Sequence, residues 1–231
     1  LDHAHRRKDE QLLPLNIVHG AVAPHNVLVS FDGDVKLTDF GLVRAFRTLP
    51  APRESLIRSY AVFSPEQARG GDPTVASDVF SFGAFLYTAL AGSAPFVGAS
   101  AAEVLGAAAE GQIRPLSSVR EDVPGTLAEL IHRALAYDPD DRFPSISSMY
   151  EELLACVYAS GLRVLLGEVA VFVDQHREAP ATIPSEGIDV LLARPLTVPQ
   201  EARPSGSGPA GASIVSVPPL TGFGEMRHVS I

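Results

Sequence analysis

The sequence has few of the features that mark secreted or membrane proteins. Its 231 residues include a single cysteine, Cys156, so no internal disulfide can form. The late apolar stretch 164–173 is interrupted by Glu168 and falls short of the roughly 20 residues that span a bilayer. Near the start, basic residues 6–8 are followed by acidic ones, which is not a secretory signal. These absences predict a soluble protein of a reducing compartment, the cytoplasm, without a membrane span.

Positive charge is also scarce. The chain carries 18 Lys and Arg against 27 Asp and Glu, a formal net charge of -9. Such a chain repels phosphate backbones, and no basic stripe with interleaved aromatic residues offsets this. We therefore expect no nucleic-acid partner. Hydrophobic residues make up 46% of the chain, which is ample for the core of one medium domain.

Apolar periodicity predicts a mainly helical chain. The predicted helices cover residues 1–13, 75–90, 101–109, 125–136 and 145–160, and a further packed segment covers 161–176. Gly92 and Gly111 follow two of these helices, as glycines commonly do at helix ends. Cys156 falls on an apolar helix face, so we expect a buried thiol.

One short β-hairpin is predicted near the start of the chain. A β-like piece at 17–19 comes first, and then Asp32-Gly33 separates the apolar runs 27–29 and 35–37. Asp-Gly between such runs predicts a tight turn in which both residues have positive φ. Residues 42–63 contain four basic residues and two prolines with little periodicity, which predicts an exposed loop.

The composition changes after Arg177. Eight of the 19 prolines fall between Pro180 and Pro219, with Ser-Gly-Ser-Gly at 205–208. This composition buries too little apolar surface to offset chain entropy. We therefore expect three parts, namely a domain over 1–158, an additional packed helical segment over 159–177 and a disordered tail over 178–231.

Five short motifs occur in a fixed order. They are His19-Gly20-Ala21-Val22-Ala23-Pro24-His25-Asn26, Asp39-Phe40-Gly41, Ser64-Pro65-Glu66, Asp78-Val79-Phe80-Ser81-Phe82-Gly83 and Asp138-Pro139-Asp140-Asp141-Arg142-Phe143. Each alone carries little weight, but the order and spacing together resemble the C-terminal lobe of protein kinases. The sequence around Ser64 and Asp78 is similar to that of bacterial Ser/Thr kinases, most of all to that of myxobacterial ones.

The resemblance implies a fold that is mainly α with a small β-hairpin, covering about residues 1–158. It implies a catalytic loop at 19–26, a D-F-G turn at 39–41 and an activation segment at 39–66. The family's N-terminal lobe, whose Gly-rich loop and lysine hold the ATP phosphates, would precede Leu1. We therefore expect the N-lobe to be absent from this chain.

The catalytic loop departs from the family pattern at three positions. Ala21 occupies the position of the catalytic base, an aspartate, and Ala23 that of a lysine that steadies the transferred phosphate. Gly20 replaces an arginine that binds a phosphorylated activation loop. A methyl group cannot accept the substrate's proton, and general-base catalysis is typically worth about 10²–10⁴-fold. No catalytic residue is intact, so we predict lost or feeble catalysis.

The metal-binding and structural positions are kept. Asn26 and Asp39 match the family's magnesium and nucleotide ligands, although both side chains could instead bond to loop backbone. Magnesium is usually held together with substrate phosphates, so Mg-ATP is expected only with an N-lobe and no cofactor is expected for this chain alone. The structural residues implied by the resemblance are His19, Phe40, Gly41, Glu66, Asp78 and Arg142. Of these, Glu66 and Arg142 are expected to form a buried ion pair, and Asp78 to anchor the catalytic-loop backbone.

Three functions follow as hypotheses. The first is a pseudokinase with a regulatory or partner-binding role in signalling, whose partner is a protein, namely the missing N-lobe, a substrate or a signalling protein. The second is a weakly active Ser/Thr kinase if an N-lobe is present, which Asn26, Asp39 and Ser59 favour, since Ser59 falls where kinases place a threonine touching the catalytic aspartate. The third is a non-functional gene fragment with an exposed apolar face.

Overall fold

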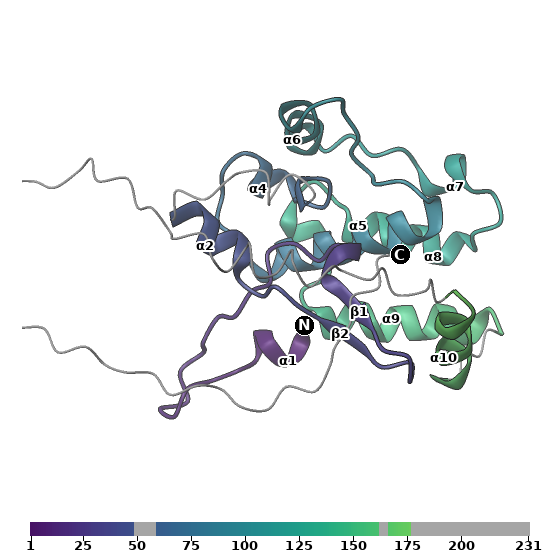
Figure 1. The fold of residues 1–231 in the computed structure, drawn as a ribbon. Helices are drawn as coiled ribbons and strands as arrows, with labels where there is room; N and C mark the ends of the chain where they lie inside the picture. The colour runs from purple at the N-terminus through teal and green to yellow at the C-terminus, as the bar shows by residue number, and fades with distance from the viewer. Residues whose placement is uncertain (49–58, 162–165, 177–231) are drawn as a thin grey trace, which may run out of the picture.

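A computed structural model describes residues 1–48, 59–161 and 166–176 (Figure 1). Within these ranges the fold is mainly α with one two-stranded antiparallel sheet, which confirms the predicted fold class. The predicted tail, 178–231, lies outside the described residues, as does the stretch 49–58 of the predicted loop.

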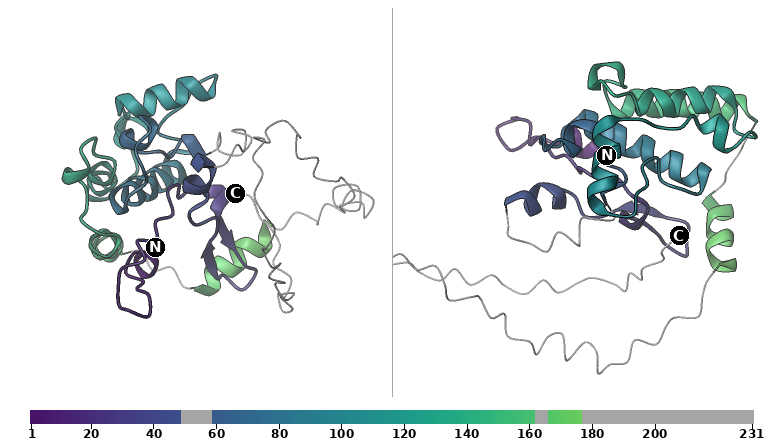
Figure 2. Two further views of the ribbon diagram at one scale, coloured as in Figure 1. Left: turned by 90° about the vertical axis from the view of Figure 1, so that its left-hand side faces the viewer. Right: turned by 90° about the horizontal axis from the view of Figure 1, so that it is seen from above.

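Helix α5 (Val75–Ala91) runs through the middle of the helical body (Figure 1). It packs against α7 (Leu116–Val119), α8 (Gly125–Ala134) and α9 (Ile146–Ala159), and α8 and α9 lie side by side (Figure 2). Gly83 permits the close approach of α5 to α8, because a Cβ at this position would lie 2.8 Å from the Cβ of Ala134. The other helices of the described ranges are α1 (Asp2–His5), η1 (Pro24–Asn26), α2 (Leu42–Thr48), α4 (Pro65–Ala68), α6 (Ala101–Glu110), η2 (Pro139–Asp141) and α10 (Leu166–Gln175).

The long helices begin and end at capping residues. The side chains of Thr74, Ser100 and Ser145 each accept a hydrogen bond from the backbone N–H three residues on. Gly92 and Gly111 end α5 and α6 in the left-handed conformation, with φ of 70° and 67°. These local signals explain why the four predicted helices between residues 75 and 160 are confirmed to within two residues at each end.

The predicted hairpin is confirmed, but its turn differs. Strand β1 (Val27–Val29) pairs with β2 (Val35–Leu37), with Val29 opposite Val35. Of the predicted Asp-Gly pair, only Gly33 has a positive φ, of 87°. Ser30 accepts from the Gly33 N–H at 3.0 Å and donates its own N–H to Asp34 at 2.8 Å, which closes a three-residue loop. Ser30 Oγ also accepts from the Asp34 N–H, so the serine side chain stabilises the longer loop.

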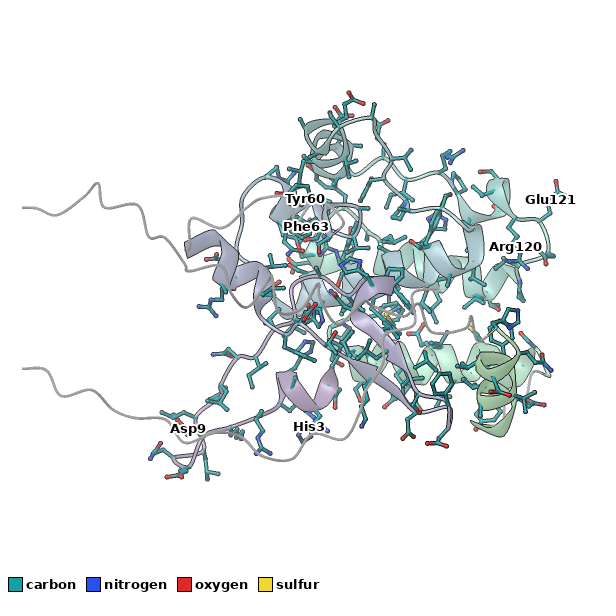
Figure 3. All side chains as sticks on the ribbon, viewed as in Figure 1. His3, Asp9, Tyr60, Phe63, Arg120 and Glu121 are labelled. Carbon is teal, nitrogen blue, oxygen red and sulfur yellow. The ribbon has the colours of Figure 1, made fainter. Side chains whose placement is uncertain are left out.

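The prediction for residues 1–13 is wrong beyond α1. The helix ends at His5, and a bridge between Lys8 and Pro14 closes a turn outside the helical body, where Figure 3 labels Asp9. The Asp9 carboxylate accepts from the N–H groups of Gln11 and Leu13, an arrangement that competes with helix. The β-like piece at 17–19 also forms no ladder within the described ranges.

The prediction of an exposed loop over 42–63 is wrong at both ends. Residues 42–48 form α2, and Tyr60, Val62 and Phe63 are buried. The rings of Tyr60 and Phe63 meet edge-on at 5.3 Å (Figure 3). Tertiary packing therefore buries a stretch whose polar composition suggested exposure.

Two predictions of burial near the end of the domain are only partly right. Helix α10 forms, but Val171 and Phe172 are each 56% exposed, so this face of the helix does not pack as expected. Cys156 is half-buried against the core instead of fully enclosed.

Candidate functional site

Helix α5 holds the backbone of the loop 19–26. The fully buried Asp78 accepts from the His19 N–H at 2.9 Å through Oδ2 and from the Gly20 N–H at 2.7 Å through Oδ1. One turn further along α5, Ser81 Oγ accepts from the Val22 N–H at 3.1 Å. Three of the first four residues of the loop thus donate their N–H groups to side chains of α5, so the loop is fixed relative to the core.

Two other elements complete this anchor. His5 of α1 places Nε2 2.7 Å from Asp78 Oδ2, and Gln67 of α4 donates from Nε2 to the Gly20 carbonyl at 2.7 Å. Gly20 has a φ of +87°, a conformation in which an L side chain is strained. The glycine at this position therefore suits the backbone geometry of this chain.

His19 is a structural residue in this geometry. Its Nε2 donates to the Thr38 carbonyl at 2.7 Å, its Nδ1 accepts from the Ala21 N–H at 3.2 Å, and its ring lies 4.8 Å from that of Phe40. Burial lowers the pKa of His19 below 6.5, against the opposing effects of the Thr38 hydrogen bond and of the nearby carboxylates. The neutral imidazole uses both nitrogens to join the loop to the Asp39-Phe40-Gly41 turn, and the His19 carbonyl also accepts from the Gly41 N–H.

A small pocket of about 60 Å³ opens beside this loop. It is lined by His19, Ala21, His25, Asn26, Asp39, Leu42, Val43 and Ser59. Ala21 is only 1% exposed and contributes a methyl group. Ser59 Oγ lies 3.5 Å from His25 Nε2, a long contact. The structure therefore brings the predicted base position and both predicted metal ligands to one pocket.

The pocket contains oxygen atoms of the kind that magnesium prefers. Asn26 donates from Nδ2 to the Ala21 carbonyl at 2.9 Å, which leaves its side-chain oxygen as the possible ligand atom. Asp39 is exposed, in a left-handed conformation with φ of 64°. Within the described ranges no group of three or more His, Cys, Asp or Glu could hold a metal ion, so magnesium at Asn26 and Asp39 would need further ligands such as phosphates.

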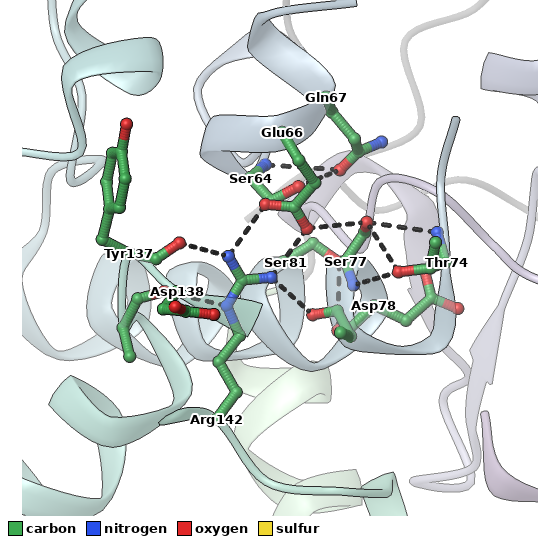
Figure 4. A network of polar contacts seen from close by, with 12 residues as sticks. Ser64, Glu66, Gln67, Thr74, Ser77, Asp78, Ser81, Tyr137, Asp138 and Arg142 are labelled. Carbon is green, nitrogen blue, oxygen red and sulfur yellow. Dashed lines mark hydrogen bonds and ion pairs between the residues drawn. The ribbon is translucent and has the colours of Figure 1, made fainter. Parts of the chain in front are cut away.

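The Glu66–Arg142 pair ties α4 to the end of the domain (Figure 4). Arg142 Nη1 and Nη2 reach the two Glu66 oxygens at 2.7 and 2.8 Å. Its other donations go to the carbonyls of Ala136, Ala76 and Tyr137. The Arg142 side chain is fully buried and that of Glu66 is 21% exposed. Every guanidinium nitrogen is therefore hydrogen-bonded inside the fold.

This pair predicts a pH dependence of stability. Burial alone would raise the pKa of Glu66, but the hydrogen bonds and charge of Arg142 outweigh it and lower the pKa from 4.5 to about 2. A carboxyl group with a depressed folded pKa stabilises the fold above its unfolded pKa, and this contribution is lost as pH falls through the folded pKa. The destabilisation caused by Glu66→Gln should thus be full at pH 7 and shrink as pH falls from about 4.5 to about 2. Urea unfolding of the native protein and of Glu66→Gln across this pH range measures the difference in stability. A difference that does not change with pH would contradict a lowered pKa of Glu66.

Sequence reasoning missed three residues that position the loop. Ser81 follows Asp78 by three residues, so helical periodicity places both on one face and could have indicated it. Gln67 directly follows the Ser64-Pro65-Glu66 motif, but its contact depends on tertiary structure. No local signal points to His5.

A helical lobe whose central helix anchors this loop, next to the Asp39-Phe40-Gly41 turn, has the architecture of a protein kinase domain. The family model described as protein tyrosine and serine/threonine kinase matches residues 10–153, and the chain belongs to this family. In the described ranges, no helix has both the length and the apolar character needed to cross a bilayer.

Similar proteins are bacterial kinases. The tyrosine-protein kinase MasK of Myxococcus xanthus is 34% identical over 154 residues, which is 66% of this chain and 24% of MasK. The serine/threonine-protein kinase PknL of Mycobacterium tuberculosis is 36% identical over 214 residues, 89% of this chain and 53% of PknL. PrkC of Bacillus subtilis is 32% identical over 152 residues. The chain thus spans between about a quarter and a half of the length of the first two.

Proposed function

We propose that the protein is a catalytically impaired Ser/Thr kinase homologue, a pseudokinase, that acts in signalling by binding a protein partner. The observation that carries the proposal is Ala21. Its buried methyl group occupies the base position of a loop that is otherwise held in place by Asp78, Ser81 and Gln67. The anchoring contacts are kept while the proton acceptor is lost, which supports a role that needs the fold but not fast chemistry.

The nucleotide part of the proposal rests on Asn26 and Asp39. Their side-chain oxygens would hold magnesium together with the phosphates of ATP, and the ion would supply charge neutralisation during phosphoryl transfer. In this chain the two residues would bind and orient the magnesium ion and the ATP phosphates. Position 21 offers no carboxylate to accept the proton of a substrate hydroxyl.

A protein partner is supported by apolar side chains around the hairpin and the Asp39-Phe40-Gly41 turn. Val35 is 61% exposed, and Phe40 and Leu42 are 38% and 39% exposed. Large apolar side chains that are exposed in this way favour a covering protein surface. The second candidate function, a weakly active Ser/Thr kinase, is favoured by the shared pocket of Asn26, Asp39 and Ser59.

The test combines nucleotide binding and turnover in the full-length protein expressed from its complete gene. Mg-ADP at 100 times its dissociation constant should stabilise the protein by about 2.7 kcal/mol, and Asp39→Ala should remove this effect. The rate of phosphate transfer to dephosphorylated casein should lie far below the roughly 1–100 s⁻¹ that is typical of kinases. Turnover within that range that Asp39→Ala abolishes would establish an active kinase instead, and an absent stabilisation by Mg-ADP would end the nucleotide part.

A further inference from the structure

Helix α7 is a four-residue helix that lies against α8 and α5 (Figure 1). Its N-cap residue is Pro115, whose side chain cannot accept a hydrogen bond. In the described part of the chain, two hydrogen bonds join α7 and its C-cap to other elements. The Leu116 N–H donates to His132 Nε2 at 2.9 Å, and Arg120 Nη1 donates to the Leu90 carbonyl at 3.0 Å. A helix this short depends on such contacts, because short isolated helices are marginal in water.

The hydrogen bond from Leu116 requires a neutral His132 ring. A ring nitrogen accepts through its lone pair, and both nitrogens of a protonated ring carry hydrogen. Because Nε2 is the acceptor here, Nδ1 carries the ring hydrogen. His132 is half-buried, and no fully buried side-chain nitrogen in the described ranges lacks a partner, so Nδ1 reaches solvent. An added proton therefore has to take the Nε2 lone pair that holds Leu116.

The surroundings of the ring favour its neutral form. Burial lowers the pKa of His132 below 6.5, and no neighbouring charge contributes to this shift. The titratable and charged residues of the elements packed there are Glu129 and Arg133 on α8, Arg114 and Arg120 on either side of α7, Tyr87 on the second half of α5 and Glu152 on α9. Two of these arginines are paired with carboxylates, Arg133 with Glu152 and Arg120 with Asp122.

The hydrogen bond holds a core residue in place. Leu116 is fully buried, and Ile113 and Val123 of the same connection between α6 and α8 are partly buried against the core. A buried N–H group that loses its acceptor destabilises the arrangement that buries it. Loss of the acceptor on His132 therefore favours an open connection in which Leu116 meets water.

We propose that His132 is a pH-sensitive latch, which holds α7 on the helical body while the ring is neutral and releases it in mildly acidic solution. In the open connection the ring takes up a proton at Nε2 and the Leu116 N–H turns to water. Since the folded pKa is lowered, the contribution of His132 to stability is complete above 6.5 and is lost as the pH falls through the folded pKa. The protein would thus expose apolar surface at α7 in acid.

The experiment measures hydrogen–deuterium exchange of the Leu116 amide in the full-length protein from about pH 7.5 to about pH 5.5, as protection relative to an unstructured chain. In the native protein this protection should fall several-fold, up to about tenfold, at the acidic end. His132→Gln should keep its protection, because the glutamine side-chain oxygen accepts the hydrogen bond and does not titrate. The matched control is His3→Gln, an exposed histidine of α1, which should behave like the native protein.

Nuclear magnetic resonance of the native protein supplies a second readout that needs no variant. The His132 ring should titrate with a midpoint below 6.5, and the Leu116 amide resonance should move with the same midpoint. The inference is overturned by an equal loss of Leu116 protection in the native protein and in His132→Gln, or by an amide resonance that stays unchanged while the ring titrates. Neither readout involves Mg-ADP or phosphate transfer, so the proposed function is tested separately.

Discussion

Replacing Arg142 by alanine is expected to lower the free energy of unfolding by about 3–5 kcal/mol, because a buried charge then loses its partner. Glu66 would keep its negative charge at a site that is 21% exposed, with Ser77 Oγ still donating to it at 3.0 Å. The carbonyls of Ala76, Ala136 and Tyr137 would lose a charged donor at the same time. Several buried acceptors fail together, so the loss is large for a single substitution.

Arg133→Ala is the matched control. Arg133 also forms one ion pair, with Glu152 at 2.9 Å, but the two side chains are 46% and 54% exposed. Exposed pairs contribute at most about 1 kcal/mol, since solvent screens the charges. Urea unfolding of the native protein and both variants at pH 7 compares the two losses. Equal losses would show that the Glu66–Arg142 pair contributes no more than a surface pair.

The parts of the fold that were predictable from sequence depend on local interactions. The helix over 75–91 is an example, because Thr74 caps its start and Gly92 ends it, and both act within a few residues. The hairpin position follows from two apolar runs around Gly33. The predicted turn type was wrong because the Ser30 hydroxyl accepts a hydrogen bond from the Asp34 N–H across the loop. The Asp-Gly pair does not indicate this contact.

The parts that were not predictable depend on contacts between distant residues. Tyr60 and Phe63 lie in a stretch without periodicity, and their burial results from packing in the core. Residues 1–13 have helical composition, but the Asp9 carboxylate binds the backbone of its own turn and replaces the helix. Local propensity is a weak guide wherever such alternatives exist.

The same distinction applies to the candidate site. Short motifs located Ala21, Asn26 and Asp39, and the structure places all three at one pocket. The contacts of His5 and Gln67 with the loop anchor span 73 and 47 residues of sequence, so no local pattern could indicate them. Motifs therefore indicated the residues of the site, whereas the fold determines how the loop is held.

Introducing the missing carboxylate is expected to raise the rate of phosphoryl transfer. Ala21→Asp places a proton acceptor in the pocket of about 60 Å³ that also contains Asn26 and Asp39. A positioned general base typically accelerates such a step by about 10²–10⁴-fold. Ala21→Asn is the matched control, because it has nearly the same shape but cannot accept a proton. Ala23 and Gly20 stay unchanged in both variants, which favours the lower part of that range.

The most direct test of the account is the transfer rate from Mg-ATP to casein for the full-length native protein, Ala21→Asp and Ala21→Asn, measured side by side. Circular dichroism and thermal unfolding of each protein verify that all three are folded. The account predicts a gain of about 10²-fold or more for the aspartate variant and none for the asparagine variant. An aspartate variant that is folded and binds Mg-ADP but transfers phosphate no faster than the native protein would contradict the claim that Ala21 is what limits catalysis.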